Sequence, residues 1–227
     1  MKVTLLNLAI SIILISCNNL DKPNEVDYTG YIEKSFYLTG RDKVEELNDT
    51  LALLQIKMPE RLDTFYRWNH YSCCSSCGWL KYRFADKKYP QLAESGWYWT
   101  IIPDSVYQLN IWHRPQWDVP DSMTYRPLNL KDTNFYFSHP RNLFSFAGNF
   151  VFIKKEFRTI NNRNFIIIAF LSPHGYLTNS ETLYLGAITH LKDRDLYFAA
   201  ECGTQDTTGF IDNLYKSFLS IRIKENP

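Results

Sequence analysis

The chain has almost no excess charge of either sign, since its 25 lysines and arginines are matched by 24 aspartates and glutamates. Only one of these cations, Lys2, precedes residue 17, so the remainder of the chain is balanced. This balance argues against a nucleic-acid partner and against a polybasic membrane patch. The longest apolar run after residue 17 covers residues 165–171, which has the length of a strand and is too short to span a membrane as a helix.

Motifs of the common enzyme classes are also missing. The sequence has no phosphate-cradling glycine loop, no dinucleotide fingerprint and no G-x-S-x-G. Its five histidines are scattered, without an H-E-x-x-H pattern. Asp193-Arg194-Asp195 lacks the glycine and the terminal glutamate of a calcium loop. We therefore favour a protein without catalytic activity and without a cofactor.

The N-terminus carries a short apolar stretch behind a single cation. Residues 5–15 follow Lys2 and end in Leu14-Ile15-Ser16-Cys17. This is the length of a signal-peptide core, and it is shorter than a transmembrane helix. The ending resembles the bacterial lipobox, which implies cleavage before Cys17 and diacylation of its thiol; an ordinary secretory signal is the alternative. The resemblance implies a cell-envelope protein attached to the membrane by lipid, and Asn18 favours the outer over the inner membrane.

The chain after the lipobox predicts one folded unit. Residues 1–16 form the predicted lipoprotein signal peptide, and the polar residues 17–28 form a flexible tether. Residues 29–227 show no repeat and no linker, and the whole chain is 45% hydrophobic and 16% aromatic, which is enough for a full core. We predict a single globular domain over 29–227.

Strand patterns dominate this domain, and helical spacing is concentrated near its end. Two turn-rich joints, 161–163 and 192–195, predict hairpins between apolar or alternating segments. Residues 165–171 are apolar on both faces, which predicts a strand covered on each side. Apolar residues with helical spacing follow in a final segment: Phe210, Ile211, Leu214, Tyr215, Phe218 and Leu219. The predicted class is α+β, an antiparallel sheet packed by a C-terminal helix.

Two segments resemble a known family. One is the strand ending Leu-Gln-Ile-Lys-Met-Pro, within residues 51–68, and the other is Phe-Ile-Asp-Asn-Leu-Tyr-Lys-Ser-Phe, within residues 183–223. Together with the antiparallel strands between them they resemble the PsbP-like α-β-α sandwich. The resemblance implies a scaffold used by non-catalytic accessory and assembly proteins.

Four cysteines remain once Cys17 is lipidated, and an even number in an exported chain favours disulfides. They are Cys73, Cys74, Cys77 and Cys202. Adjacent cysteines in extended chain point to opposite sides, so only one of the first two can face Cys202. We predict a Cys73–Cys202 bridge and a local Cys74–Cys77 pair. Two alternatives stay open: a metal site that adds His70 to these four cysteines, and a redox or enzymatic role for the cluster.

All six tryptophans lie within residues 68–117. Flat indoles on a sheet suit stacking against sugar rings or partner side chains, although they also serve as core residues. The candidate ligand-binding residues are Trp79, Trp97, Trp99, Trp112 and Trp117. We expect a lipid-anchored binding or accessory protein whose aromatic-rich surface engages an envelope protein or a glycan.

Overall fold

The computed structural model describes residues 26–40, 49–70, 79–89, 106–116, 119–138, 150–173, 181–203 and 207–225. Over these ranges the chain forms ten strands and two α-helices, arranged in two antiparallel sheets. None of the helices within them is long and apolar enough to cross a membrane. The predicted signal peptide, Cys17 and most of the tether lie outside the described residues.

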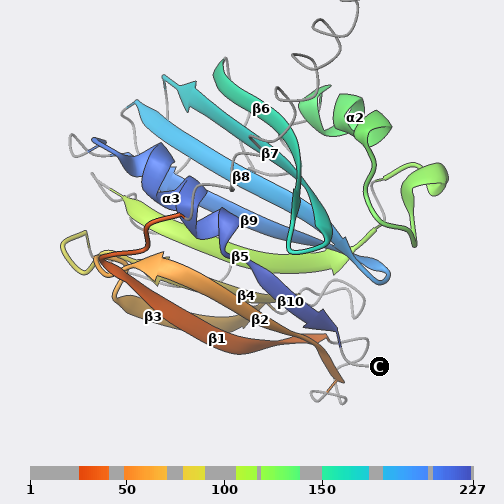
Figure 1. The fold of residues 1–227 in the computed structure, drawn as a ribbon, viewed down its shortest axis with the longest axis horizontal. Helices are drawn as coiled ribbons and strands as arrows, with labels where there is room; N and C mark the ends of the chain where they lie inside the picture. Colours follow the sequence, from red (N-terminus) through yellow and green to blue (C-terminus); the bar gives the residue numbers. More distant parts are fainter. Residues whose placement is uncertain are drawn as a thin grey trace, which may run out of the picture.

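A seven-stranded antiparallel sheet forms the centre of the molecule (Figure 1). Its order is β3-β4-β5-β9-β8-β7-β6, so β3 and β6 are its edges. The strands are β3 (Thr64–His70), β4 (Trp79–Ala85), β5 (Tyr107–Pro115), β6 (Val151–Ile160), β7 (Arg163–Ser172), β8 (Thr182–Leu191) and β9 (Arg194–Cys202).

Both predicted hairpins are present. Asn161 and Asn162 join β6 to β7 with positive φ angles of 46° and 65°, which asparagine tolerates better than most residues. Lys192, with φ 55°, lies in the turn between β8 and β9. The apolar run in β7 is buried on both faces, as its composition predicts. The two turns lie at the same end of the sheet, which we call the turn end (Figure 1).

One face of this sheet, the inner face, packs against a smaller sheet and a helix. The smaller sheet has the order β1-β2-β10, from β1 (Tyr31–Gly40), β2 (Asp49–Pro59) and β10 (Arg222–Glu225). The helix is α3 (Phe210–Leu219), which contacts β2 and β8. Leu54, Phe198 and Phe218 are among the fully buried side chains of this core.

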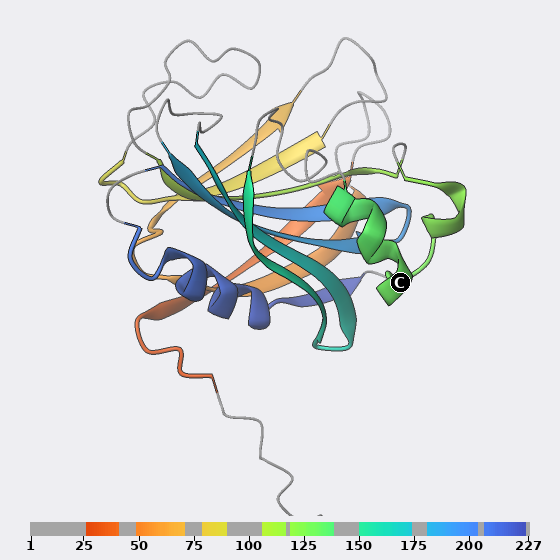
Figure 2. The ribbon, with the colours of Figure 1, turned by 90° about the horizontal axis from the view of Figure 1, so that it is seen from above.

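The opposite, outer face is covered by an irregular segment, residues 119–138. It contains two 3₁₀ turns, η1 (Asp121–Met123) and η2 (Leu130–Asp132), followed by the short helix α2 (Thr133–Ser138). Its Met123, Leu128 and Tyr136 pack against apolar side chains of β7, β8 and β9. Figure 2 shows α2 and α3 at well separated places around the large sheet.

The predicted α+β class is wrong, because the fold is mainly antiparallel β. The apolar stripe of α3 does pack on the large sheet: the Phe218 and Phe198 rings lie 5.9 Å apart. Yet a ten-residue helix is only about 15 Å long, whereas seven strands about 4.8 Å apart span roughly 29 Å. The helix therefore covers only part of the inner face, and strands β1, β2 and β10 supply the rest of that layer.

Candidate functional site

Of the five predicted binding tryptophans, Trp112 is the one whose side chain is described. It lies half-buried on β5, and its indole stacks on the ring of Tyr197 from β9, with centroids 5.3 Å apart and planes 8° apart. Only the backbone of Trp79 is described, at the start of β4. Trp97, Trp99 and Trp117 lie outside the described residues.

The strand register places Trp112 in a row with residues from three other strands. Trp68 on β3 pairs with Lys81 on β4, Lys81 pairs with Trp112, and Trp112 pairs with Tyr197. Residues paired across antiparallel strands belong to the same face of a sheet, so this row runs along the outer face. Sequence periodicity could not find the row, because it does not show that β5 pairs with β9.

Two polar side chains, Arg114 and Asp195, contact Tyr197 at the end of this row. Arg114 Nε donates a hydrogen bond to Tyr197 Oη over 3.0 Å, and its guanidinium lies 5.1 Å from the centre of the Tyr197 ring. Tyr197 Oη in turn donates to Asp195 Oδ2 over 2.9 Å. The indole of Trp112 is thus backed by a ring whose hydroxyl and face are both held in place.

Asp195 is the centre of a buried polar cluster made of Gln116, Tyr136, His190, Asp195 and Tyr197. Gln116 Nε2 donates to Asp195 Oδ1 over 3.0 Å, and His190 Nε2 lies 3.3 Å from the same oxygen. Tyr136 Oη lies 3.1 Å from His190 Nε2. Burial raises the pKa of the Asp195 carboxyl, which is 1% exposed. Burial, together with the nearby Asp195 carboxylate, raises the pKa of both tyrosines, so the two hydroxyls stay protonated at neutral pH.

The cluster ties the segment 119–138 to the sheet. His190 Nδ1 lies 2.7 Å from the backbone oxygen of Arg126, and because a carbonyl only accepts, this nitrogen carries a hydrogen. Gln116 Oε1 accepts from the backbone N–H of Tyr125 over 2.9 Å. Because its members are 8% exposed or less, the cluster acts as a scaffold and not as a contact surface.

Two further features shape this segment. Tyr125 is 78% exposed and has a φ of 56°, a left-handed conformation that costs an ordinary residue about 1–2 kcal/mol. Arg126 donates two hydrogen bonds of 2.8 Å to the carboxylate of Asp132. Burial alone would raise the pKa of Asp132, but the hydrogen bonds from Arg126 and from the Asn129 backbone hold it below its ordinary value.

A cleft of 310 Å³ opens beside the buried polar cluster, at the turn end of the sheet. Segment 125–128, both hairpin turns and the end of β10 line it. Its walls include Arg126, Arg163, Lys192 and Glu225, and His190 lies at its base. The volume reaches the lower end of the range of small-molecule sites. No local sequence pattern indicates this cleft, since its residues come from four separate parts of the chain.

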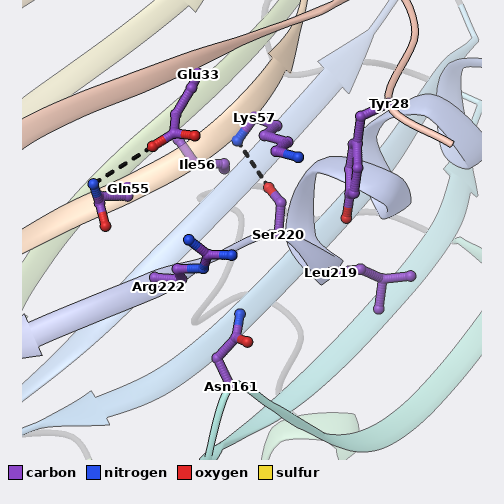
Figure 3. A pocket seen from close by; sticks show the side chains of 9 residues that line it. All are labelled: Tyr28, Glu33, Gln55, Ile56, Lys57, Asn161, Leu219, Ser220 and Arg222. Carbon is purple, nitrogen blue, oxygen red and sulfur yellow. Dashed lines mark hydrogen bonds between the residues drawn. The ribbon is translucent and has the colours of Figure 1, made fainter. Parts of the chain in front are cut away.

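A second, smaller pocket of 110 Å³ lies between β2, β10 and the end of α3 (Figure 3). Its polar groups are engaged with one another: the Lys57 backbone N–H donates to Ser220 Oγ over 2.8 Å, and Gln55 contacts Glu33 over 3.5 Å. Lys57 Nζ lies 4.1 Å from the centre of the Tyr28 ring. This volume is well below that of typical ligand sites, so the cleft beside His190 is the better candidate.

The predicted cysteine cluster falls mostly outside the described residues. Cys73, Cys74 and Cys77 are not among them, and Cys202 is buried at the end of β9. His70 and Trp79, which flank residues 71–78, lie at the turn end, whereas Cys202 pairs with Tyr107 at the far end. The Cys73–Cys202 bridge would require that segment to return along the sheet. It stays a prediction that non-reducing peptide mapping tests.

The predicted metal alternative is also untested at its ligands, because only the backbone of His70 is described and three of the four cysteines are not described at all. Elsewhere in the described ranges, no group of three or more His, Cys, Asp or Glu side chains is placed to hold a metal ion.

Comparisons with known proteins add similarity at the level of structure. No protein-family model matches the chain, and no curated protein matches it. Among solved structures, it is similar to the solution structure of cyanobacterial PsbP (CyanoP) from Synechocystis sp. PCC 6803. The TM-score is 0.45 at 12% identity, over 84% of this chain and 92% of that one. At this level of similarity the match carries no argument about fold or function.

Proposed function

We propose that this chain is a lipid-anchored, non-catalytic binding or accessory protein of the cell envelope. The lipid on Cys17 would attach it to a membrane, with the outer membrane favoured by Asn18. The tryptophan-rich segment 68–117 would supply the surface that engages an envelope protein or a glycan. The observation that carries the proposal is the stack of Trp112 on Tyr197 at the outer face.

That stack has the properties of a binding platform. An indole offers a large apolar area and loses little rotamer entropy on binding. The half-buried Trp112 is braced from behind by Tyr197, which Arg114 and Asp195 hold through its hydroxyl. A side chain already fixed in this way costs little to order when a partner arrives.

The point at which the tether joins the folded body supports the same proposal. The body begins near Tyr31, which pairs with Pro59, whereas the cleft residue Glu225 pairs with Ala52. At about 3.3 Å per residue, roughly 23 Å of strand β2 separates these two levels. The tether would therefore join the body away from the turn end and leave that end open to partners.

The anchoring part of the proposal is tested at the lipobox. Cys17→Ala should block cleavage by the lipoprotein signal peptidase and abolish labelling with a palmitate analogue, and the wild-type chain should fractionate with the outer membrane. Tyr37→Ala, an exposed change on β1, is the matched control and should be labelled like wild type. Unchanged labelling of Cys17→Ala would contradict a lipid anchor.

The binding part is tested at Trp112. The full-length protein in detergent should co-sediment with purified peptidoglycan sacculi or cross-link to an outer-membrane protein. Trp112→Ala should weaken that association about tenfold, whereas Trp112→Phe, which keeps a ring on Tyr197, should retain most of it. Equal association of Trp112→Ala and wild type would rule out the aromatic platform.

A further inference from the structure

The cleft at the turn end has one wall that is held rigidly by the rest of the fold. Segment 125–128 makes three hydrogen bonds with side chains from three separate parts of the chain. The Tyr125 N–H donates to Gln116 Oε1. His190 Nδ1 donates to the Arg126 carbonyl. Asn164 Nδ2 donates to the Leu128 carbonyl over 2.7 Å. Gln116 itself donates to Asp195 Oδ1, and His190 Nε2 lies 3.3 Å from the same oxygen. The wall is thus preorganised, which lowers the entropic cost of binding.

Tyr125 provides an aromatic surface at the rim of this wall. Its side chain is 78% exposed and lines the cleft. The left-handed backbone at this position is unfavourable for tyrosine and would suit glycine, so local stability does not explain the residue. Strained backbone of this kind, supported by its surroundings, is typical of binding sites. The ring is therefore a platform against which a ligand can stack.

The two arginines of the cleft are already paired. Arg163 donates to the carboxylate of Glu225 and to the backbone oxygen of His190, and Arg126 is paired with Asp132. A phosphate site needs cations whose charge is available to the ligand, which these pairs do not offer. Three planar groups instead face a ligand: the Arg163 guanidinium donates hydrogen bonds, the Glu225 carboxylate accepts them, and the exposed Asn162 amide does both.

We infer that this cleft binds a neutral saccharide unit of a glycan. The C–H face of the sugar ring would stack on Tyr125, and its hydroxyls would bond to Arg163, Glu225 and Asn162. The inference rests on the proposed function, since it assumes a glycan partner, and it names the ligand class and a second contact point. Trp112 and this cleft lie toward the same end of the sheet, so one extended glycan would contact both.

The test is calorimetric titration of the full-length protein in detergent with cellobiose, maltose and N,N′-diacetylchitobiose, and with inorganic phosphate as the anionic probe. At least one disaccharide should bind saturably, and phosphate should not. Tyr125→Gly should weaken that binding about tenfold without lowering the melting temperature, because glycine accepts the left-handed backbone. Tyr125→Trp should retain binding, and so should Asp212→Ala, an exposed change on α3 near the far end of the sheet, where Phe210 of the same helix contacts Tyr107.

Three outcomes would overturn the inference: no saturable binding of any of the three disaccharides, full affinity in Tyr125→Gly, or binding of phosphate alone. None of these bears on labelling at Cys17 or on the Trp112-dependent association with sacculi or an outer-membrane protein. The inference and the proposed function can therefore fail separately.

Discussion

The two faces of the seven-stranded sheet are sealed by different means. The inner face meets regular elements, β1, β2, β10 and α3, and its core is almost wholly apolar. The outer face meets the irregular segment 119–138, whose only α-helix has six residues. Irregular backbone leaves N–H and carbonyl groups that need partners, and Gln116, His190 and Asn164 supply them. The apolar face secures stability, and the polar groups of the outer face fix the position of residues such as Tyr125.

The inner face has a polar exception at its turn end. His113 and Arg194 are buried there, at 0% and 2% exposure. His113 Nε2 donates to the Thr39 carbonyl over 2.9 Å. Burial, reinforced by the charge of Arg194, lowers the pKa of His113 to about 4. The histidine thus stays neutral at pH 7.

The largest expected effect is on the inner face. Phe218→Ala should lower the free energy of unfolding by about 3–5 kcal/mol, because it empties a fully buried site between α3 and Phe198. Urea denaturation measures this change. Asp212→Ala, on the exposed side of the same helix, should cost no more than about 0.5 kcal/mol. Equal small effects of both changes would mean that α3 is peripheral to the core.

A slightly smaller effect is expected from the outer face. Asp195→Ala should cost about 3 kcal/mol, because it leaves the buried donors of Gln116 and Tyr197 without their acceptor. Asp195→Asn should cost less, since it keeps one acceptor oxygen and removes a carboxylate whose pKa burial raises. Chemical denaturation would compare the two. An alanine variant as stable as wild type would show that the cluster does not hold the outer face.

The exception at His113 predicts a pH dependence. The ordinary histidine pKa is 6.5 and the folded value is about 4, so between these values the unfolded chain binds more protons. Stability should therefore fall as the pH drops from about 6.5 through 4, by about 3 kcal/mol in total. His113→Gln, which can keep the donor to Thr39, should flatten this part of the profile. An unchanged acid profile in the variant would assign the loss to other groups.

The smallest effect sharpens the role of Tyr125. Tyr125→Gly should raise the free energy of unfolding by about 0.5–1 kcal/mol, because glycine removes the strain of the left-handed backbone. Tyr125→Ala is the matched control, since it also removes the ring but keeps the strained Cβ, and it should gain nothing. If alanine stabilised the protein as much as glycine, the exposed ring and not the backbone would be the source of the strain.

Local patterns predicted many elements correctly. Both hairpins and the final helix followed from turn residues and from apolar spacing, because these signals lie within a few neighbouring residues. The class was wrong because sequence periodicity showed the apolar stripe of α3 but not how much of the face it had to cover. Strand β10, only four residues long, completes that layer through its pairing with β2.

The candidate site, like the fold, was predicted from the sequence only in part. Tryptophan composition singled out Trp112, whereas the buried polar cluster and the cleft went unnoticed. Gln116, Tyr136, His190 and Asp195 lie up to 79 residues apart in sequence, between Gln116 and Asp195. Each of them is unremarkable alone, and no local pattern links them.

By itself the sequence determined the alternation of strands, the positions of the tight turns, the apolar stripe of the last helix and the N-terminal resemblance to a lipobox. Each of these depends on contacts between residues close in the chain. Tertiary structure alone decided which strands are neighbours, which layer covers each face, and where Tyr125, Arg163 and Glu225 meet. The physical reason is that strands pair through backbone hydrogen bonds, which almost every residue can make. The order of the strands in the sheet is therefore selected only when both faces of the sheet are buried together.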